Sequence, residues 1–259
     1  MKVNKQASFL MLETEIKLAK INDPVKQIFD KINFDFIYNL VKDKYSKKGC
    51  DGYDPVSLFK ALLLLYLGES DSERTLAKKL SFDSRAIYLC GFDFYKTPSH
   101  ATFHYFRKRL GEETFFEILH NLIAQAITLK LISGSITPVD ATHIWAYSNK
   151  FGKKLCKCKG KCEHELSYSD KDANWGHKTK NYSFFGYKVH LLVDAQSQLP
   201  ISLTVTPASI SDSSQLKPLI DSVVEKHKSL SLSKLPADKA YDSLENYKLL
   251  IDEYSIEPF

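Results

Sequence analysis

Two aspartates lie where a carboxylate could do chemistry. Asp140 is in the middle of SITPVDATHIWA (135–146), a stretch that is otherwise rich in apolar and hydroxyl side chains and is typical of a β-strand. Asp238 directly follows a short strand-like stretch that ends at Ala237. On neighbouring strands, two such carboxylates could hold a divalent cation such as Mg²⁺, and bound metals can promote phosphodiester chemistry. The alternative is structural, because an aspartate at a strand end often caps the next helix.

A second group of ligand-type residues lies between these aspartates. Cys156, Cys158 and Cys162 form the pattern C-x-C-x3-C, and His164 follows two residues later. Thiolates and imidazoles are the usual ligands of tetrahedral structural zinc sites, so these four residues could bind Zn²⁺. The spacing differs from the usual C-x2-C pair, and thiols without a metal in an exposed loop are therefore the alternative.

The cysteines belong to a basic segment. The whole chain has 36 Lys and Arg against 31 Asp and Glu, a net charge of +5. Residues 141–193 alone hold ten lysines against four acidic residues, together with both tryptophans. Lysines contact phosphates and flat rings stack on bases, so this composition suits a nucleic-acid partner. We expect Lys178, Lys180 and Lys188 to contact DNA; the alternative is a solvated loop with ordinary core aromatics.

The first half of the chain has the pattern of a helical domain. Asp54 can cap a helix that begins at Pro55, and the sequence PVSLFKALLLLYL is apolar on nearly every face, as expected of a buried central helix. Apolar residues at helical spacing predict a further helix from about 112 to 132. We therefore expect an all-α domain at residues 51–132, preceded by a lead segment at residues 1–50.

Three cations end the helix that Ser99 can cap. They are Arg107, Lys108 and Arg109, and Gly111 follows them. We expect this helix to contact phosphates as part of a small helical DNA-binding domain. The alternative is local, because cations stabilise the C-terminus of any helix through its dipole.

The second half of the chain predicts an α/β domain at residues 133–259, with a basic cysteine-rich insert at about 148–182. Three strands come first, and a helix, a strand and a helix follow them, as in a sheet layered with helices. The expected strands are 135–146, 184–194, 199–206 and 231–237, and the expected helices are 213–226 and 243–253.

Composition excludes some classes of protein. With 44% hydrophobic and 26% charged residues, the chain is typical of a folded globular protein. No apolar run approaches the roughly 18 residues that a spanning helix needs, and the N-terminus has no secretory signal pattern. We expect a cytoplasmic protein without a membrane partner.

The chain resembles bacterial insertion-sequence transposases of the DDE type over roughly residues 50–259. Similarity to their N-terminal helical domain lies in YDPVSLFKALLLLYLGESDSERTLAKKLSFD (53–83) and HATFHYFRKRLG (100–111). Similarity to their catalytic domain, which has an RNase H-like fold, lies in PVDATHI (138–144), FFGYKVHLLVD (184–194) and ADKAYDS (237–243).

This resemblance implies a function. Asp140 corresponds to the first catalytic aspartate and Asp238 to the second, with Mg²⁺ or Mn²⁺ as cofactor. It further implies a homo-oligomer that binds double-stranded DNA at the ends of a transposable element and at its target. The reaction would be metal-dependent phosphodiester cleavage followed by strand transfer.

The sequence departs from this family at its third acid. In the family, a glutamate lies on a helix well beyond the second aspartate, whereas this sequence ends at Phe259. Glu245, Glu253 and Glu257 resemble the segment directly after the second aspartate. We therefore expect a chain that is truncated at its C-terminus. Two alternatives stay open: an inactive DNA-binding fragment that acts as a remnant or inhibitor, and a zinc-dependent DNA-binding regulator.

Overall fold

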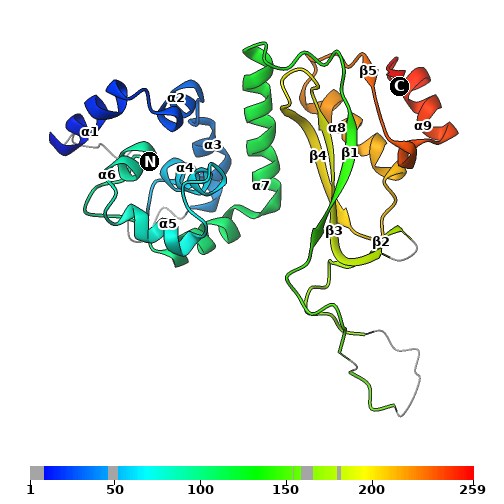
Figure 1. Cartoon of the computed structure of the whole chain (residues 1–259), viewed down its shortest axis with the longest axis horizontal. Helices are drawn as coiled ribbons and strands as arrows, with labels where there is room; N and C mark the ends of the chain where they lie inside the picture. Colours follow the sequence, from blue (N-terminus) through cyan, green and yellow to red (C-terminus); the bar gives the residue numbers. More distant parts are fainter. Residues whose placement is uncertain (1–8, 46–51, 154, 159–165, 180–181) are drawn as a thin grey trace. The chain divides into compact units, whose positions relative to one another are not determined.

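The computed structural model describes residues 9–45, 52–153, 155–158, 166–179 and 182–259. The chain forms two compact units, Met1–Leu122 and Ile123–Phe259, which we call the helical unit and the α/β unit (Figure 1). Among the helices that are described, none combines the length and the apolar character needed to cross a membrane.

The helical unit is built from short helices, and capping residues mark where several of them begin and end. Asp54 accepts a hydrogen bond from the Ser57 backbone N–H and caps the helix that begins at Pro55, as predicted. Gly91, with φ of 77°, ends another helix in the left-handed conformation that glycine adopts without strain. The described elements are α1 (Phe9–Lys20), α2 (Pro24–Lys31), α3 (Phe36–Val41), η1 (Lys42–Lys44), α4 (Pro55–Tyr66), α5 (Glu73–Leu80), α6 (Ser84–Cys90) and the first part of α7 (His100–Thr128).

The core of this unit surrounds α4. Ala61 and Leu64 are fully buried, which confirms that α4 is the central helix expected from its apolar sequence. Leu18 of α1 and Phe29 of α2 lie in the same core, so residues 9–44 pack as part of the helical unit. The structure therefore differs from the expected lead segment at 1–50, because the amphipathic faces of these helices bury their apolar side chains against α4 and α6.

Gly111 interrupts α7. Its φ of 71° and ψ of 169° are not helical, so α7 consists of two helical pieces on either side of this residue. The sequence predicts the same break, between the helix that Ser99 begins and the helix that starts near residue 112. The second piece ends at Thr128, four residues earlier than expected.

The α/β unit has β3 at its centre. This long strand pairs antiparallel with β1, β2 and β4, and a hairpin at residues 195–198 joins it to β4 as predicted. The strands are β1 (Val139–Trp145), β2 (Asn174–Thr179), β3 (Tyr182–Val193), β4 (Pro200–Pro207), β5 (Lys234–Leu235) and β6 (Glu257–Pro258). The other elements are η2 (Ser213–Gln215), α8 (Leu216–Lys226), η3 (Lys239–Tyr241), α9 (Leu244–Lys248) and η4 (Leu249–Glu253), a turn of π-helix.

Parallel bridges extend the sheet beyond β1. Ile136 pairs with Lys234 and Val139 with Ala237, and β5 in turn pairs with β6 in parallel. The resulting order is β4–β3–β1–β5–β6, and α8 packs against β3 and β4 (Figure 1). Three antiparallel strands followed by two parallel ones are the RNase H-like arrangement, which confirms the expected fold class. The strand β2 lies inside the segment expected to be an insert. Because β2 pairs with β3, this part of the segment belongs to the sheet.

Candidate functional site

The sheet brings Asp140 and Asp238 together. Val139 and Ala237 form a parallel bridge, and the Val139 backbone N–H donates a 3.0 Å hydrogen bond to the Pro236 carbonyl. Each aspartate is the next residue after this bridge. Neighbouring strands lie about 4.8 Å apart, so the two aspartates stand side by side at one end of the pairing.

Both carboxylates are exposed and make only local hydrogen bonds. Asp140 Oδ1 accepts the Ala141 N–H at 2.7 Å, and Asp238 Oδ1 accepts the Ala240 N–H at 2.9 Å as the cap of η3. The capping alternative therefore holds for Asp238, but one cap bond leaves its second oxygen and further lone pairs open. Adjacent, solvent-accessible carboxylate oxygens are the ligands that Mg²⁺ and Mn²⁺ prefer, so the donor set fits the expected cation.

Tyr241 lies beside this pair at the end of the same turn. Its side chain is buried, and its hydroxyl has no hydrogen-bond partner among the described residues. Burial raises the pKa of this hydroxyl, and neighbouring negative charges raise it further. Those charges belong to Asp212, Asp140 and Asp238. The turn after β5 therefore lies in an acidic environment formed by three carboxylates.

A partly buried ion pair connects the loop after β4 to the sheet. Lys188 Nζ donates to Asp212 Oδ1 at 2.8 Å and to the Ile210 carbonyl at 2.9 Å. The buried His190 ring contacts Thr206 Oγ1 through Nε2 at 3.0 Å. Burial lowers the pKa of His190, Asp212 partly opposes this shift and Lys188 adds to it. The Lys188 ammonium therefore has a structural role within the unit, and its expected contact with DNA stays a prediction.

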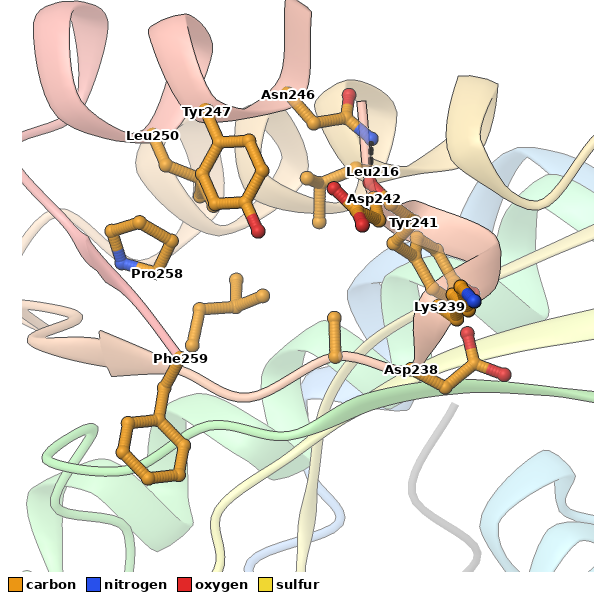
Figure 2. Close-up of a pocket in the computed structure, with 12 residues that line it drawn as sticks. Leu216, Asp238, Lys239, Tyr241, Asp242, Asn246, Tyr247, Leu250, Pro258 and Phe259 are labelled. Carbon is orange, nitrogen blue, oxygen red and sulfur yellow. Dashed lines mark hydrogen bonds between the residues drawn. The ribbon is translucent and has the colours of Figure 1, made fainter. Parts of the chain in front are cut away.

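A cavity of about 280 Å³ opens next to Asp238 (Figure 2). Its wall is mainly apolar and includes Leu216, Leu235 and Phe259. Figure 2 shows the Asp238 carboxylate at the rim, pointing away from Phe259 and Pro258.

The acidic residues near the C-terminus do not join the aspartate pair. Glu253 lies 3.0 Å from Lys217 Nζ, Glu257 lies 3.1 Å from Lys234 Nζ, and Glu245 is exposed on α9. Within the described ranges, no group of three or more Asp, Glu, His or Cys side chains is arranged to hold a metal. The described site therefore offers two carboxylates.

The cysteine cluster is only partly described. Cys156 is half-buried and Cys158 is exposed, whereas Cys162, His164 and Lys180 lie outside the described residues. Lys178 is described and exposed on β2. The structure thus leaves the expected zinc site as a prediction.

The cations of α7 have different surroundings, all within the helical unit. Arg107 Nε lies 2.7 Å from Glu73 Oε1, and the Arg109 guanidinium lies 4.6 Å from the centre of the Tyr45 ring. Lys108 is exposed. Local partners therefore account for two of the three cations, and Lys108 is the one most available to a phosphate.

Asp212, Tyr241 and Asn246 are site residues that our sequence analysis did not single out. Asn246 could have been found, because it shares helical spacing with the buried Leu249 and Leu250 and is therefore a polar residue on an apolar face. Asp212 carries no comparable signal, since its contact with Lys188 depends on how β3 and the loop after β4 meet.

Comparison with known families matches both halves of the chain. Residues 13–109 match a family described as "Transposase domain (DUF772)", and residues 132–256 match "Transposase DDE domain". No curated protein matches the chain.

Solved structures give more distant likenesses. A piggyBac transposase synaptic complex with hairpin DNA has a TM-score of 0.39 and 10% identity, covering 90% of this chain and 47% of that one. A Mos1 transposase paired-end complex with left transposon end has a TM-score of 0.27 and 12% identity, covering 83% and 61%. The chain thus spans about half the length of the first protein. The two family matches cover the helical and α/β parts in their expected order, and the chain belongs to the DDE transposase family.

Proposed function

We propose that this protein acts in DNA transposition, as a metal-dependent transposase that cleaves a phosphodiester at the ends of an element and transfers the strand to target DNA. The observation that carries this proposal is the placement of Asp140 and Asp238, each one residue beyond the parallel Val139–Ala237 bridge, in a domain that matches the DDE family. Its partners would be double-stranded DNA and further copies of the chain, in the cytoplasm.

In this proposal the two aspartates hold Mg²⁺ or Mn²⁺ through their exposed carboxylate oxygens. The bound cation supplies activation of the attacking oxygen and stabilisation of the leaving oxygen. Asp140 is fixed by the β1–β3 pairing and Asp238 by its cap bond to Ala240, so the sheet and the turn set the spacing between the two ligands. Neither residue acts as a nucleophile.

Each unit offers exposed cations for the DNA backbone. Lys108 on α7 and Lys178 on β2 are exposed, and Arg107 and Arg109 flank the first of them. Phosphate contacts of this kind give affinity without sequence specificity, and they weaken as salt rises.

Strand cleavage tests the proposal. The chain is incubated with Mg²⁺ and with DNA that carries the ends of the element encoding it, alongside the Asp140→Asn and Asp238→Asn variants. We expect nicking that requires both the metal and both aspartates, with DNA binding retained in the variants. Equal nicking by the wild type and either variant would contradict the assignment.

A second function is favoured by the two-carboxylate site. With no third ligand beside the pair in the described part of the chain, the protein would bind DNA without cutting it and would inhibit an active relative. This function predicts salt-sensitive DNA binding and no nicking by the wild type in the same experiment.

A structural zinc site at Cys156, Cys158, Cys162 and His164 forms a separate part of the proposal. The chemistry of these ligands supports it. Zinc would be retained by the purified chain in a 1:1 ratio and lost on replacing Cys158 with Ser. If a chelator removes the metal and abolishes DNA binding, the zinc-dependent regulator becomes the better description. An absence of bound zinc would exclude both the structural zinc site and the zinc-dependent regulator.

A further inference from the structure

Asn246 is a buried polar side chain on the apolar face of α9. Its Nδ2 donates to the Tyr241 carbonyl at 2.8 Å, to the Ser213 carbonyl at 3.2 Å and to Ser213 Oγ at 3.0 Å. Figure 2 shows this amide pointing from α9 toward the turn of Tyr241. The backbone of Asn246 is satisfied separately, because its N–H donates to Ser243 Oγ at the helix cap. The side chain is therefore committed to two other segments.

The first of these segments is the turn that carries Asp238. This turn is η3, in which the Tyr241 N–H donates to the Asp238 carbonyl at 3.1 Å and the Ala240 N–H to the Asp238 carboxylate at 2.9 Å. The parallel bridge to β1 ends one residue earlier, at Ala237. The position of Asp238 thus depends on how the turn is held at its other end, where Asn246 binds.

The second segment leads back to the sheet. Ser213 directly follows Asp212, whose carboxylate is paired with Lys188 of β3 at 2.8 Å. One amide group therefore links the turn of Asp238 to the strand that also pairs with β1, on which Asp140 lies. A metal site needs its ligands held to within about 0.5 Å by residues whose own positions are fixed by supporting hydrogen bonds.

We propose that Asn246 is a positioning residue that holds the Asp238 carboxylate in place beside Asp140 for a divalent cation. This inference rests on the proposed function, since it takes the aspartate pair as the metal site. Asn246 itself touches neither the cation nor DNA.

The test measures Mn²⁺ binding by electron paramagnetic resonance and stability by thermal unfolding. Asn246→Ala removes the side-chain hydrogen bonds to Tyr241 and Ser213. Asn174→Ala is the matched control, because it is the same substitution at an exposed position on β2. We expect Asn246→Ala to raise the Kd for Mn²⁺ by about tenfold or more, and Asn174→Ala to leave it unchanged. Should Asn246→Ala not fold, Ser213→Ala removes one acceptor of the amide and is expected to raise the Kd in the same direction.

Amide hydrogen exchange provides a readout that does not need the metal. Exchange at Ala240 and Tyr241 should be faster in Asn246→Ala than in the wild type and the control. A folded Asn246→Ala variant with wild-type Mn²⁺ affinity and unchanged exchange in this turn would overturn the inference. By contrast, if Asp140→Asn and Asp238→Asn bind Mn²⁺ as the wild type does, the proposed function itself fails. Hydrogen exchange then shows separately whether Asn246 holds the turn of Asp238.

Discussion

Asp140 and Asp238 occupy matched positions on two parallel segments of the sheet, each one residue beyond the Val139–Ala237 bridge. Two carboxylates so placed repel each other, and both are exposed to water, which screens that repulsion. A pair of like charges at this distance does not stabilise the folded state. A cation between them would remove the conflict, which is the physical reason to regard the pair as a site.

The exposed Lys108 and the partly buried Lys188 should respond differently to substitution. Lys108→Ala should weaken DNA binding uniformly across sequences and reduce the salt slope by about 1, because one phosphate contact is lost. Lys188→Ala should instead destabilise the fold by about 1–3 kcal/mol, since it removes the hydrogen-bonded partner of Asp212. Fluorescence anisotropy at several salt concentrations and urea unfolding separate the two effects. A change in salt slope for Lys188→Ala with unchanged stability would contradict the structural role given to this residue.

Asp194 should make the fold sensitive to acid. Its carboxylate is fully buried; burial alone would raise its pKa, but backbone N–H groups of Ser197 and Gly134 and nearby hydroxyls lower the pKa to about 2. A lowered pKa in the folded state means that the carboxylate stabilises the fold above pH 4 and that this contribution is lost as the pH falls toward 2. The contribution is on the order of 2 kcal/mol at neutral pH.

Asp194→Asn tests this expectation. Urea unfolding at pH 7 should show a less stable variant, and the difference from the wild type should shrink at pH 3. If the difference were the same at both pH values, the ionised carboxylate would not be the source of the stability.

Gly186 should tolerate no side chain. A Cβ at this position would lie 2.0 Å from the Ile144 carbonyl oxygen, which belongs to the neighbouring strand β1. Gly186→Ala should therefore force β1 and β3 apart at a cost of about 1–3 kcal/mol. At Gly52 a Cβ would meet no atom within 4 Å, so Gly52→Ala serves as the control. Equal thermal stability of the two variants would show that the strands can shift without cost.

The sequence allowed the elements with local signals to be predicted. The start of α4 at Pro55, the break at Gly111 and the hairpin after Asp194 each depend on residues a few positions apart. The strand β2 was missed, because its pairing with β3 across a bulge leaves no alternating pattern in its own sequence. Asp140 and Asp238 were predicted largely through a resemblance, whereas Asn246 acquires its role only when α9, η2 and η3 meet.

The most direct test of the account is to locate the cation. Crystals of the chain soaked in Mn²⁺ and measured at the manganese absorption edge would show anomalous density at each bound ion. We predict a peak in contact with carboxylate oxygens of both Asp140 and Asp238, at ligand distances of about 2.0–2.2 Å. No peak between the two aspartates at saturating Mn²⁺, or a peak that persists in Asp140→Asn crystals, would contradict the assignment of this pair as the metal site.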